Sequence, residues 1–188
     1  MRGKSLWRIL GEKNQNTGPA RAAGSWCGSG AECLCGTADG RDERIDNALG
    51  GQRLKEKWAG GPKTFVGVMV DGFPNMFMIM GPHAALGNNP RSIEYNVEWV
   101  RDLIGHMTQD GRTLADATQA ATDQWNAVVH QKAEGLLSNE IDSWMTGINL
   151  NVAGKQTRTI VRYSGTAPEY RARCDEVAAG GYSELRFL

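Results

Sequence analysis

The sequence has no net charge and no long hydrophobic run. Its 21 Lys and Arg residues balance 21 Asp and Glu residues. The basic residues are scattered along the chain, which does not favour a nucleic-acid partner. No apolar stretch approaches the roughly 18 residues that indicate a membrane-spanning helix, and the basic N-terminus lacks the pattern of a secretory signal. We therefore expect a cytoplasmic chain with no membrane partner and no nucleic-acid partner.

Cysteine and histidine are also scarce, with four cysteines and three histidines. Three of the cysteines form a C-x5-C-x-C cluster at Cys27, Cys33 and Cys35. This cluster lacks the paired C-x2-C spacing and the nearby histidine of a zinc ribbon. Unpaired thiols are typical of a cytoplasmic chain, although the spacing leaves a disulfide open. The histidines are not grouped at metal-ligand spacing, so no metal site is expected.

The glycine-rich fingerprint of dinucleotide-binding domains is absent as well. No Gly-x-Gly-x-x-Gly occurs in the sequence, so the chain has no recognisable cradle for a cofactor pyrophosphate. Residues 1–49 lack a sustained period of 3.6 or 2, and their composition is typical of a disordered or loosely packed segment. A linker and a separate interaction tail are alternatives for this region. The chain thus divides into a segment of low pattern, 1–49, and a patterned region, 50–188.

The most informative stretch runs from Gly72 to Trp99, GFPNMFMIMGPHAALGNNPRSIEYNVEW. Its apolar run, 76–80, predicts a buried strand. A turn rich in small residues follows, and Asn89-Pro90 predicts the start of a helix, because Asn can cap a helix and Pro suits its first turn. A strand, a small-residue turn and a helix N-terminus together present backbone N–H groups to a ligand with partial negative charge. An ordinary turn without a ligand is the alternative.

The rest of the patterned region predicts an α/β fold with a few strands and a mainly helical part. Residues 64–70, 76–80 and 157–163 read as strands. A helix after Pro90 carries one apolar stripe, made of Ile93, Val97, Val100, Ile104 and Met107. A second helix is expected over 113–137, capped by Thr113. A last helix starts at Ala167-Pro168-Glu169, with Tyr170, Cys174 and Val177 on one face.

Several segments of this region resemble the Baeyer–Villiger monooxygenases. They are LKEKW followed by GP, GFPNMFMIMGP with GPHAALGNNPRSIEYNVEW, the W-x-x-G-x-N…GK loop from Trp144, and the ending CDEVAAGGY. The resemblance covers about Gly50 to Leu188 and implies the C-terminal portion of a flavoprotein with two dinucleotide-binding domains. It implies FAD and NADPH as cofactors of the complete enzyme. It also implies oxidation of a ketone by O2 to an ester or lactone through a C4a-peroxyflavin.

The resemblance further implies two groups of cofactor contacts and no catalytic residue. The turn would lie against the flavin through Gly81, Pro82, Leu86, Asn88 and Asn89. The later loop would fold over the active site and meet the nicotinamide cofactor through Trp144, Asn149 and Lys155. Packing of the tryptophan on the preceding helix is the alternative for this loop. His83 is expected to line the pocket, whereas Trp58, Trp99 and Trp125 are expected in the core.

The sequence also departs from the family pattern. The Ala-Thr-Gly-type segment expected before Gly50 is missing, which suggests a frame or gene-model junction there, whereas the C-terminus matches the family's own ending. The long fingerprint between the two nucleotide domains and the upstream Arg that supports the flavin peroxide are also missing, so we expect a partial enzyme that is inactive alone. The turn is shorter than in phenylacetone-type members, and Asn89 replaces an apolar residue, so the substrate is not defined. A non-catalytic helical interaction module and an N- or S-oxidising flavin monooxygenase are the alternatives.

Overall fold

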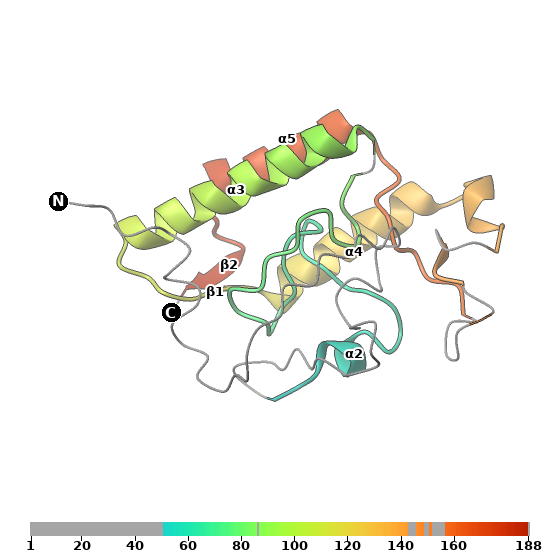
Figure 1. Cartoon of the computed structure of the whole chain (residues 1–188), viewed down its shortest axis with the longest axis horizontal. Helices are drawn as coiled ribbons and strands as arrows, with labels where there is room; N and C mark the ends of the chain where they lie inside the picture. Colours follow the sequence, from blue (N-terminus) through green and yellow to red (C-terminus); the bar gives the residue numbers. More distant parts are fainter. Residues whose placement is uncertain (1–50, 86, 143–145, 149–150, 152–156, 188) are drawn as a thin grey trace, which may run out of the picture.

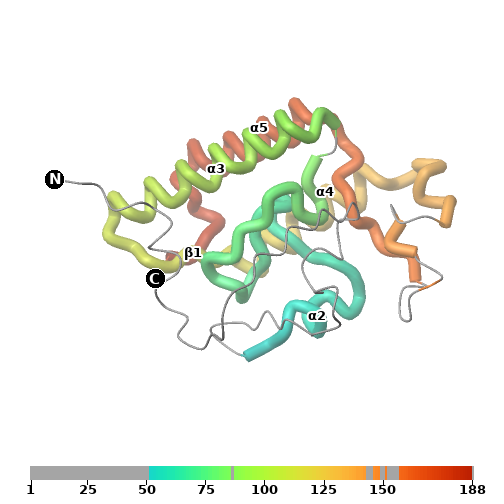
Figure 2. The backbone as a smooth tube through the Cα atoms, in the orientation of Figure 1, coloured from blue at the N-terminus to red at the C-terminus, as the bar shows by residue number. Residues whose placement is uncertain are grey.

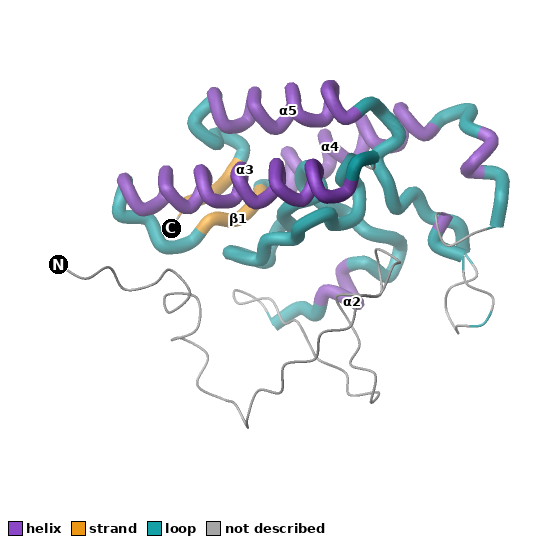
Figure 3. The backbone as a smooth tube through the Cα atoms, turned by 45° about the horizontal axis from the view of Figure 1, so that its top comes forward, coloured by secondary structure: helices purple, strands orange, loops and turns teal. Residues whose placement is uncertain are grey.

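A computed structural model describes residues 51–85, 87–142, 146–148, 151 and 157–187. Three long helices dominate this part of the chain: α3 (Asn89–Gln109), α4 (Gln119–Ala133) and α5 (Ala167–Ala179). A short helix α2 (Leu54–Lys57), a 3-10 helix η1 (Leu137–Asn139) and the strands β1 (Ala115–Ala117) and β2 (Leu185–Phe187) complete the elements. Helices α3 and α5 lie side by side, with α4 beneath them (Figures 1 and 3). The described residues therefore confirm the expected fold class, in which helices and strands are mixed. The strands form a small sheet.

Helix α3 forms where it was expected, but its cap is Asn88 rather than Asn89, and it buries a different face. Asn88 is its N-cap, because the Asn88 side chain accepts a hydrogen bond from the Arg91 N–H, and Pro90 lies in the first turn. The buried positions are Asn96, Trp99, Leu103 and Met107. The stripe expected from spacing is therefore wrong at Val97, which is 49% exposed. The helix is apolar on more than one side, and the large Trp99 and Leu103 side chains determine which side packs inward.

The region before α4 was assigned wrongly from the sequence. Residues 115–117 form β1 rather than helix, and Thr118 is the N-cap, its side chain accepting a hydrogen bond from the Ala121 N–H. The expected cap, Thr113, lies outside the helix. Within α4, Ala121, Trp125 and Val129 are buried, which confirms the expectation for Trp125. The two threonines are both plausible caps by residue type, and pairing with a distant strand selects between them.

Helix α5 agrees with the sequence in its start and its buried face. Thr166 and Glu169 form a reciprocal capping box at its first turn, which satisfies backbone donors at both positions. Tyr170, Cys174 and Val177 are buried as expected. The chain then turns at Gly180 and reaches β2, a strand that the sequence did not predict.

The small sheet ties the C-terminal end of the described chain to the segment before α4. Strands β1 and β2 run antiparallel, with Asp116 opposite Arg186. Asp116 is buried, forms an ion pair with Arg186 and accepts a hydrogen bond from the Gly72 N–H at 2.8 Å. A buried carboxylate needs such partners, so this residue joins three segments that are far apart in the sequence.

The three strands expected at 64–70, 76–80 and 157–163 are not formed among the described residues. Each segment makes only single bridges or isolated hydrogen bonds, such as Met78 N–H to Val68 O at 2.8 Å. Positive φ angles at Val66 and Met80 interrupt the extended conformation in the first two segments. A β-rich composition gives a strand only where a neighbouring strand can accept its hydrogen bonds. Figure 2 shows the segment between α2 and α3 as a coiled path beside α4 instead.

Candidate functional site

The turn before α3 is the first candidate site. Pro82 is buried, whereas Asn88 and Asn89 are exposed at the start of the helix. Leu86 lies outside the described residues. The turn therefore has a buried first half, which fixes it to the body of the molecule, and an exposed second half, which leads into the helix N-terminus.

Two glycines allow the buried half of the turn to pack closely. A Cβ on Gly67 would lie 2.5 Å from the Ala84 backbone nitrogen, and one on Gly81 would lie 2.6 Å from the Gly67 carbonyl oxygen. Real Cβ atoms do not approach backbone atoms so closely. Gly81 thus has a packing role that is independent of any ligand. We call the two interlocked segments, 64–70 and 78–85, the glycine interlock.

The backbone of the glycine interlock is strained at several residues that are not glycine. Val66, Met80 and His83 have φ angles of 45°, 56° and 67°. Such angles are unusual for any residue with a side chain, and most unusual for a β-branched one. Each costs on the order of 1–3 kcal/mol and persists only where the surroundings enforce it. The polar contacts of these residues therefore show which parts of the chain enforce the strained conformation.

His83 connects the glycine interlock to residues 160–161. Its side chain is fully buried. The ring Nε2 lies 2.8 Å from the Ile160 carbonyl oxygen, to which it donates, and Nδ1 lies 3.3 Å from Thr64 Oγ1. Burial lowers the pKa of His83 from its usual 6.5 to about 4, so the ring is neutral near pH 7. The prediction that this residue lines a pocket is wrong, because the ring is enclosed by its own chain.

The exposed half of the turn provides a weakly positive surface. Asn88 accepts the Arg91 N–H through its side chain and the Ser92 N–H through its carbonyl group, and Pro90 has no N–H. No acidic residue lies in the first turn of α3. The partial positive charge of the helix N-terminus is therefore not offset locally. The residues fit an electron-rich edge of a ligand better than a cation.

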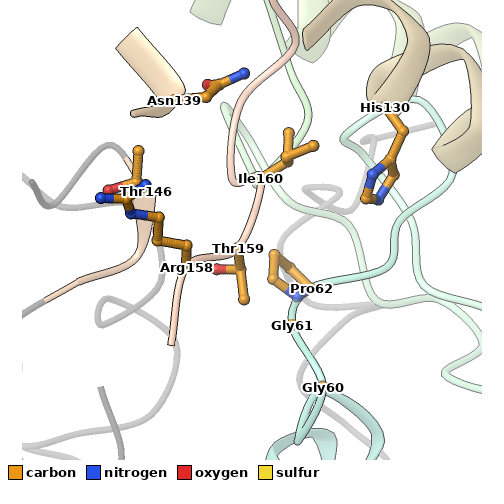
Figure 4. A pocket seen from close by; sticks show the side chains of 9 residues that line it. All are labelled: Gly60, Gly61, Pro62, His130, Asn139, Thr146, Arg158, Thr159 and Ile160. Carbon is orange, nitrogen blue, oxygen red and sulfur yellow. The ribbon is translucent and has the colours of Figure 1, made fainter. Parts of the chain in front are cut away.

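A second candidate site is a cavity of about 250 Å³ between the segment after α2, the end of α4 and residues 158–160 (Figure 4). It is lined by backbone, hydroxyl, amide, imidazole, guanidinium and aliphatic groups, at Gly60, Gly61, Pro62, His130, Asn139, Thr146, Arg158, Thr159 and Ile160. The Arg158 guanidinium also pairs with Asp142 at 2.7 Å. The expected cofactor contacts Trp144, Asn149 and Lys155 lie outside the described residues. Thr146 belongs to that loop in the sequence and Arg158 follows it, so described residues from this part of the chain line the cavity.

The remaining sequence predictions have mixed outcomes. Trp99 and Trp125 are buried in the core as expected, whereas Trp58 is only partly buried. His106 is partly exposed and His130 is exposed. Among the described residues no group of His, Cys, Asp and Glu could hold a metal ion. The described helices include none that is both long and apolar enough to cross a bilayer.

The buried polar residues around the glycine interlock were not predicted from the sequence. Thr64 accepts the Gly67 N–H at 3.3 Å and donates to the Pro82 carbonyl oxygen at 3.1 Å. Asn126 donates to the Thr64 carbonyl oxygen at 3.0 Å. Asn96 could have been suspected, because it is a polar residue one turn before Trp99, but its partners are distant in the sequence.

Comparison with known proteins identifies relatives for most of the chain. No protein-family model matches it. The chain is 37% identical over 133 residues to a phenazine N-monooxygenase of Lysobacter antibioticus, covering 71% of this chain and 24% of that protein. It is 34% identical over 160 residues to a cyclohexanone 1,2-monooxygenase of an Acinetobacter species, covering 83% of this chain and 28% of that protein.

Solved structures give the same result. A cyclohexanone monooxygenase from a Rhodococcus species, bound to NADP+, matches with a TM-score of 0.71 at 30% identity, covering 77% of this chain and 26% of that one. A steroid monooxygenase bound to NADP matches with a TM-score of 0.66 at 34% identity, covering 74% and 25%. The chain spans about a quarter of the length of these proteins. Over the matched residues, the chain therefore belongs to the Baeyer–Villiger monooxygenase family.

Proposed function

We propose that this chain is the C-terminal part of an FAD- and NADPH-dependent monooxygenase. In the complete enzyme the reaction would use O2 to convert a small-molecule ketone to an ester or lactone. The observation that carries the proposal is the agreement of sequence and structure: 34% identity to a cyclohexanone monooxygenase and a TM-score of 0.71 to another. Residues 50–188 would form the family region, and residues 1–49 a separate segment.

The turn before α3 would provide one wall of the flavin site. The residues assigned to it are Gly81, Pro82, Leu86, Asn88 and Asn89. When bound, the flavin would supply the redox chemistry between NADPH and O2. The chain's own contribution is electrostatic, because the α3 N-terminus, with no acidic residue in its first turn, would stabilise negative charge on the ring. The buried half of the turn would keep that helix start in a fixed position.

The loop that carries Trp144, Asn149 and Lys155 would cover the nicotinamide cofactor. Thr146, within the loop, and Arg158, which follows it in the sequence, line the cavity of about 250 Å³, which supports the proposal that the loop region borders an open site. A loop that closes over bound cofactor would exclude water from the reaction. No residue of this chain is assigned a catalytic role.

A second reaction on the same scaffold is N-oxygenation. The specific observation in its favour is the 37% identity to a phenazine N-monooxygenase. The W-x-x-G-x-N loop favours the ketone reaction. A non-catalytic module is the third possibility, and the exposed apolar residues Val97, Leu137 and Ile141 support it, because exposed apolar groups can mark an interaction surface.

A chimera would separate the three. Residues 50–188 would replace the matching quarter of the Acinetobacter cyclohexanone monooxygenase, and the purified chimera would be tested with NADPH, FAD and either cyclohexanone or a phenazine. We expect lactone formation from cyclohexanone. Oxidation of the phenazine alone would favour N-oxygenation. A folded chimera that retains FAD but oxidises neither compound would favour the non-catalytic module.

The 188-residue polypeptide alone should neither retain FAD nor consume NADPH with a ketone, because it lacks any Gly-x-Gly-x-x-Gly cradle. An absorbance scan after incubation with FAD and desalting tests this, with circular dichroism to establish that the chain is folded. Flavin bands that survive desalting would contradict this expectation.

A further inference from the structure

Two buried side chains hold the strained positions of the glycine interlock. Asn96, from α3, accepts the Met80 N–H through Oδ1 at 3.3 Å. Its Nδ2 donates to the Tyr170 hydroxyl at 3.1 Å, and that hydroxyl donates to the Val66 carbonyl oxygen at 2.7 Å. Asn96 is 2% exposed and Tyr170 3%. One uninterrupted chain of hydrogen bonds therefore links Met80 to Val66 through two helices.

Each bond in this chain has its donor and acceptor assigned without conflict. The asparagine uses its oxygen toward a backbone N–H and its NH2 group toward a hydroxyl. The tyrosine accepts once and donates its single proton to a carbonyl oxygen. Burial raises the pKa of Tyr170 well above its usual range, so the hydroxyl keeps that proton. A fully satisfied buried network of this kind favours one arrangement over its alternatives.

The two backbone groups that the network binds belong to strained residues. Val66 and Met80 have φ angles of 45° and 56°. They lie on different segments, which approach each other closely at Gly67 and Gly81. Conformations of this kind persist only when the surroundings impose them, and here the side chains that bind these residues come from α3 and α5.

We propose that Tyr170 and Asn96 are positioning residues for the turn that leads into α3. Met80 is the residue immediately before Gly81, and the turn ends at Asn88, which caps α3. Asn96 lies on α3 itself. Both ends of the turn are thus bound to the same helix, one through the cap and the other through Asn96. The network sets the conformation of the turn, and its effect on flavin rests on the proposed function above.

The test is hydrogen exchange on the flavin-free chain with Tyr170→Phe, which removes only the hydroxyl. The matched control is Tyr95→Phe. The Tyr95 hydroxyl also lies between α3 and α5, but its hydrogen-bond partners are the Asp175 carboxylate at 2.8 Å and the Arg171 carbonyl oxygen at 3.1 Å, away from the turn. We expect the amides of Met78 and Met80 to exchange at least about tenfold faster in Tyr170→Phe and within about twofold of wild type in Tyr95→Phe.

Unchanged exchange at these amides, or an equal rise in both variants, would overturn the proposal. If Tyr170→Phe does not fold, Asn96→Leu keeps the volume of the side chain and removes both polar groups. It should speed exchange at Met80 by a similar factor, and normal protection there would overturn the proposal. Because no flavin is present, a failure of this proposal and a failure of the proposed function give different results.

Discussion

The helical frame and the glycine interlock are determined in different ways. The helices α3, α4 and α5 begin at side-chain caps of the expected kind, Asn88, Thr118 and Thr166. These are local signals that act over a single turn. The interlock has no such local signal. Val66, Met80 and His83 adopt conformations that their own residue types disfavour, and residues more than ten positions away stabilise them.

This difference explains where the candidate site lies. A periodic helix tolerates exchange of one surface residue for another, whereas a strained segment depends on each of its buried partners. The turn assigned to the flavin overlaps the strained segment, because Gly81, Pro82 and the strained His83 belong to both. The following predictions compare the two regions, beginning with the largest effect.

The largest effect is expected in the helical frame. Trp99→Ala should lower the free energy of unfolding by about 3–5 kcal/mol, because a buried aromatic side chain is lost together with its hydrogen bond to the Cys174 carbonyl oxygen. Val97→Ala, on the exposed side of the same helix, should cost less than about 0.5 kcal/mol. Urea unfolding followed by circular dichroism measures both. Equal losses would mean that the helix buries the other face.

His83 should make stability depend on pH. Its pKa is lowered from 6.5 to about 4 in the folded chain, so between these values the unfolded chain binds more protons than the folded one. The stabilisation is complete above pH 6.5 and is lost as the pH falls toward 4, by about 3 kcal/mol. His83→Gln should remove this part of the pH dependence. The free energy of unfolding of wild type and His83→Gln should be measured at a series of pH values. An equal decline in the two proteins would show that other groups cause it.

Gly67→Ala tests the close contact of the interlock. The new Cβ would meet the Ala84 backbone at 2.5 Å and would also force a positive φ of 69° on alanine. We expect a loss of about 2–3 kcal/mol. Gly111→Ala is the matched control, since Gly111 has a similar φ of 67° with no atom within 4 Å of its Cβ position, and should cost about 1 kcal/mol. Similar losses of stability at the two glycines would show that the positive φ angle, and not the close contact with Ala84, accounts for the effect.

The smallest effect concerns the start of α4. Thr118→Ala should cost about 1 kcal/mol, because the Ala121 N–H loses its acceptor. Thr118→Ser keeps the hydroxyl and should lie within a few tenths of a kcal/mol of wild type. Thermal unfolding of both variants measures the difference. Loss of stability in the serine variant would assign the role to the threonine methyl group instead.

The sequence could predict the helices and not the extended segments, for a physical reason. Capping and apolar spacing act between residues that are near one another in the chain, so the start of α5 at Ala167 and its buried Tyr170 and Val177 were assigned correctly. Strands need partners, and the apolar run 76–80 has none among the described residues. Strand β1 was missed because its partner β2 lies about seventy residues away and carries no signal of its own.

The candidate site, like the fold, could be predicted only in part from the sequence. The start of α3 follows from Asn and Pro near the helix start, and the resemblance to the monooxygenases identified the turn before it. The bonds that hold this turn could not be predicted. Asn96, Tyr170 and His83 bind backbone groups of other segments. Because every residue has backbone groups, the residue type at the partner position does not indicate the bond.

The central claim is that the turn before α3 faces a flavin, and hydrogen exchange with and without excess FAD tests it most directly. Binding to the isolated chain is expected to be weak, so FAD must be present throughout the labelling. We predict slower exchange confined to residues 81–92, with the core of α4 unchanged. Protection located elsewhere, or none at FAD concentrations that saturate a weak site, would contradict the account.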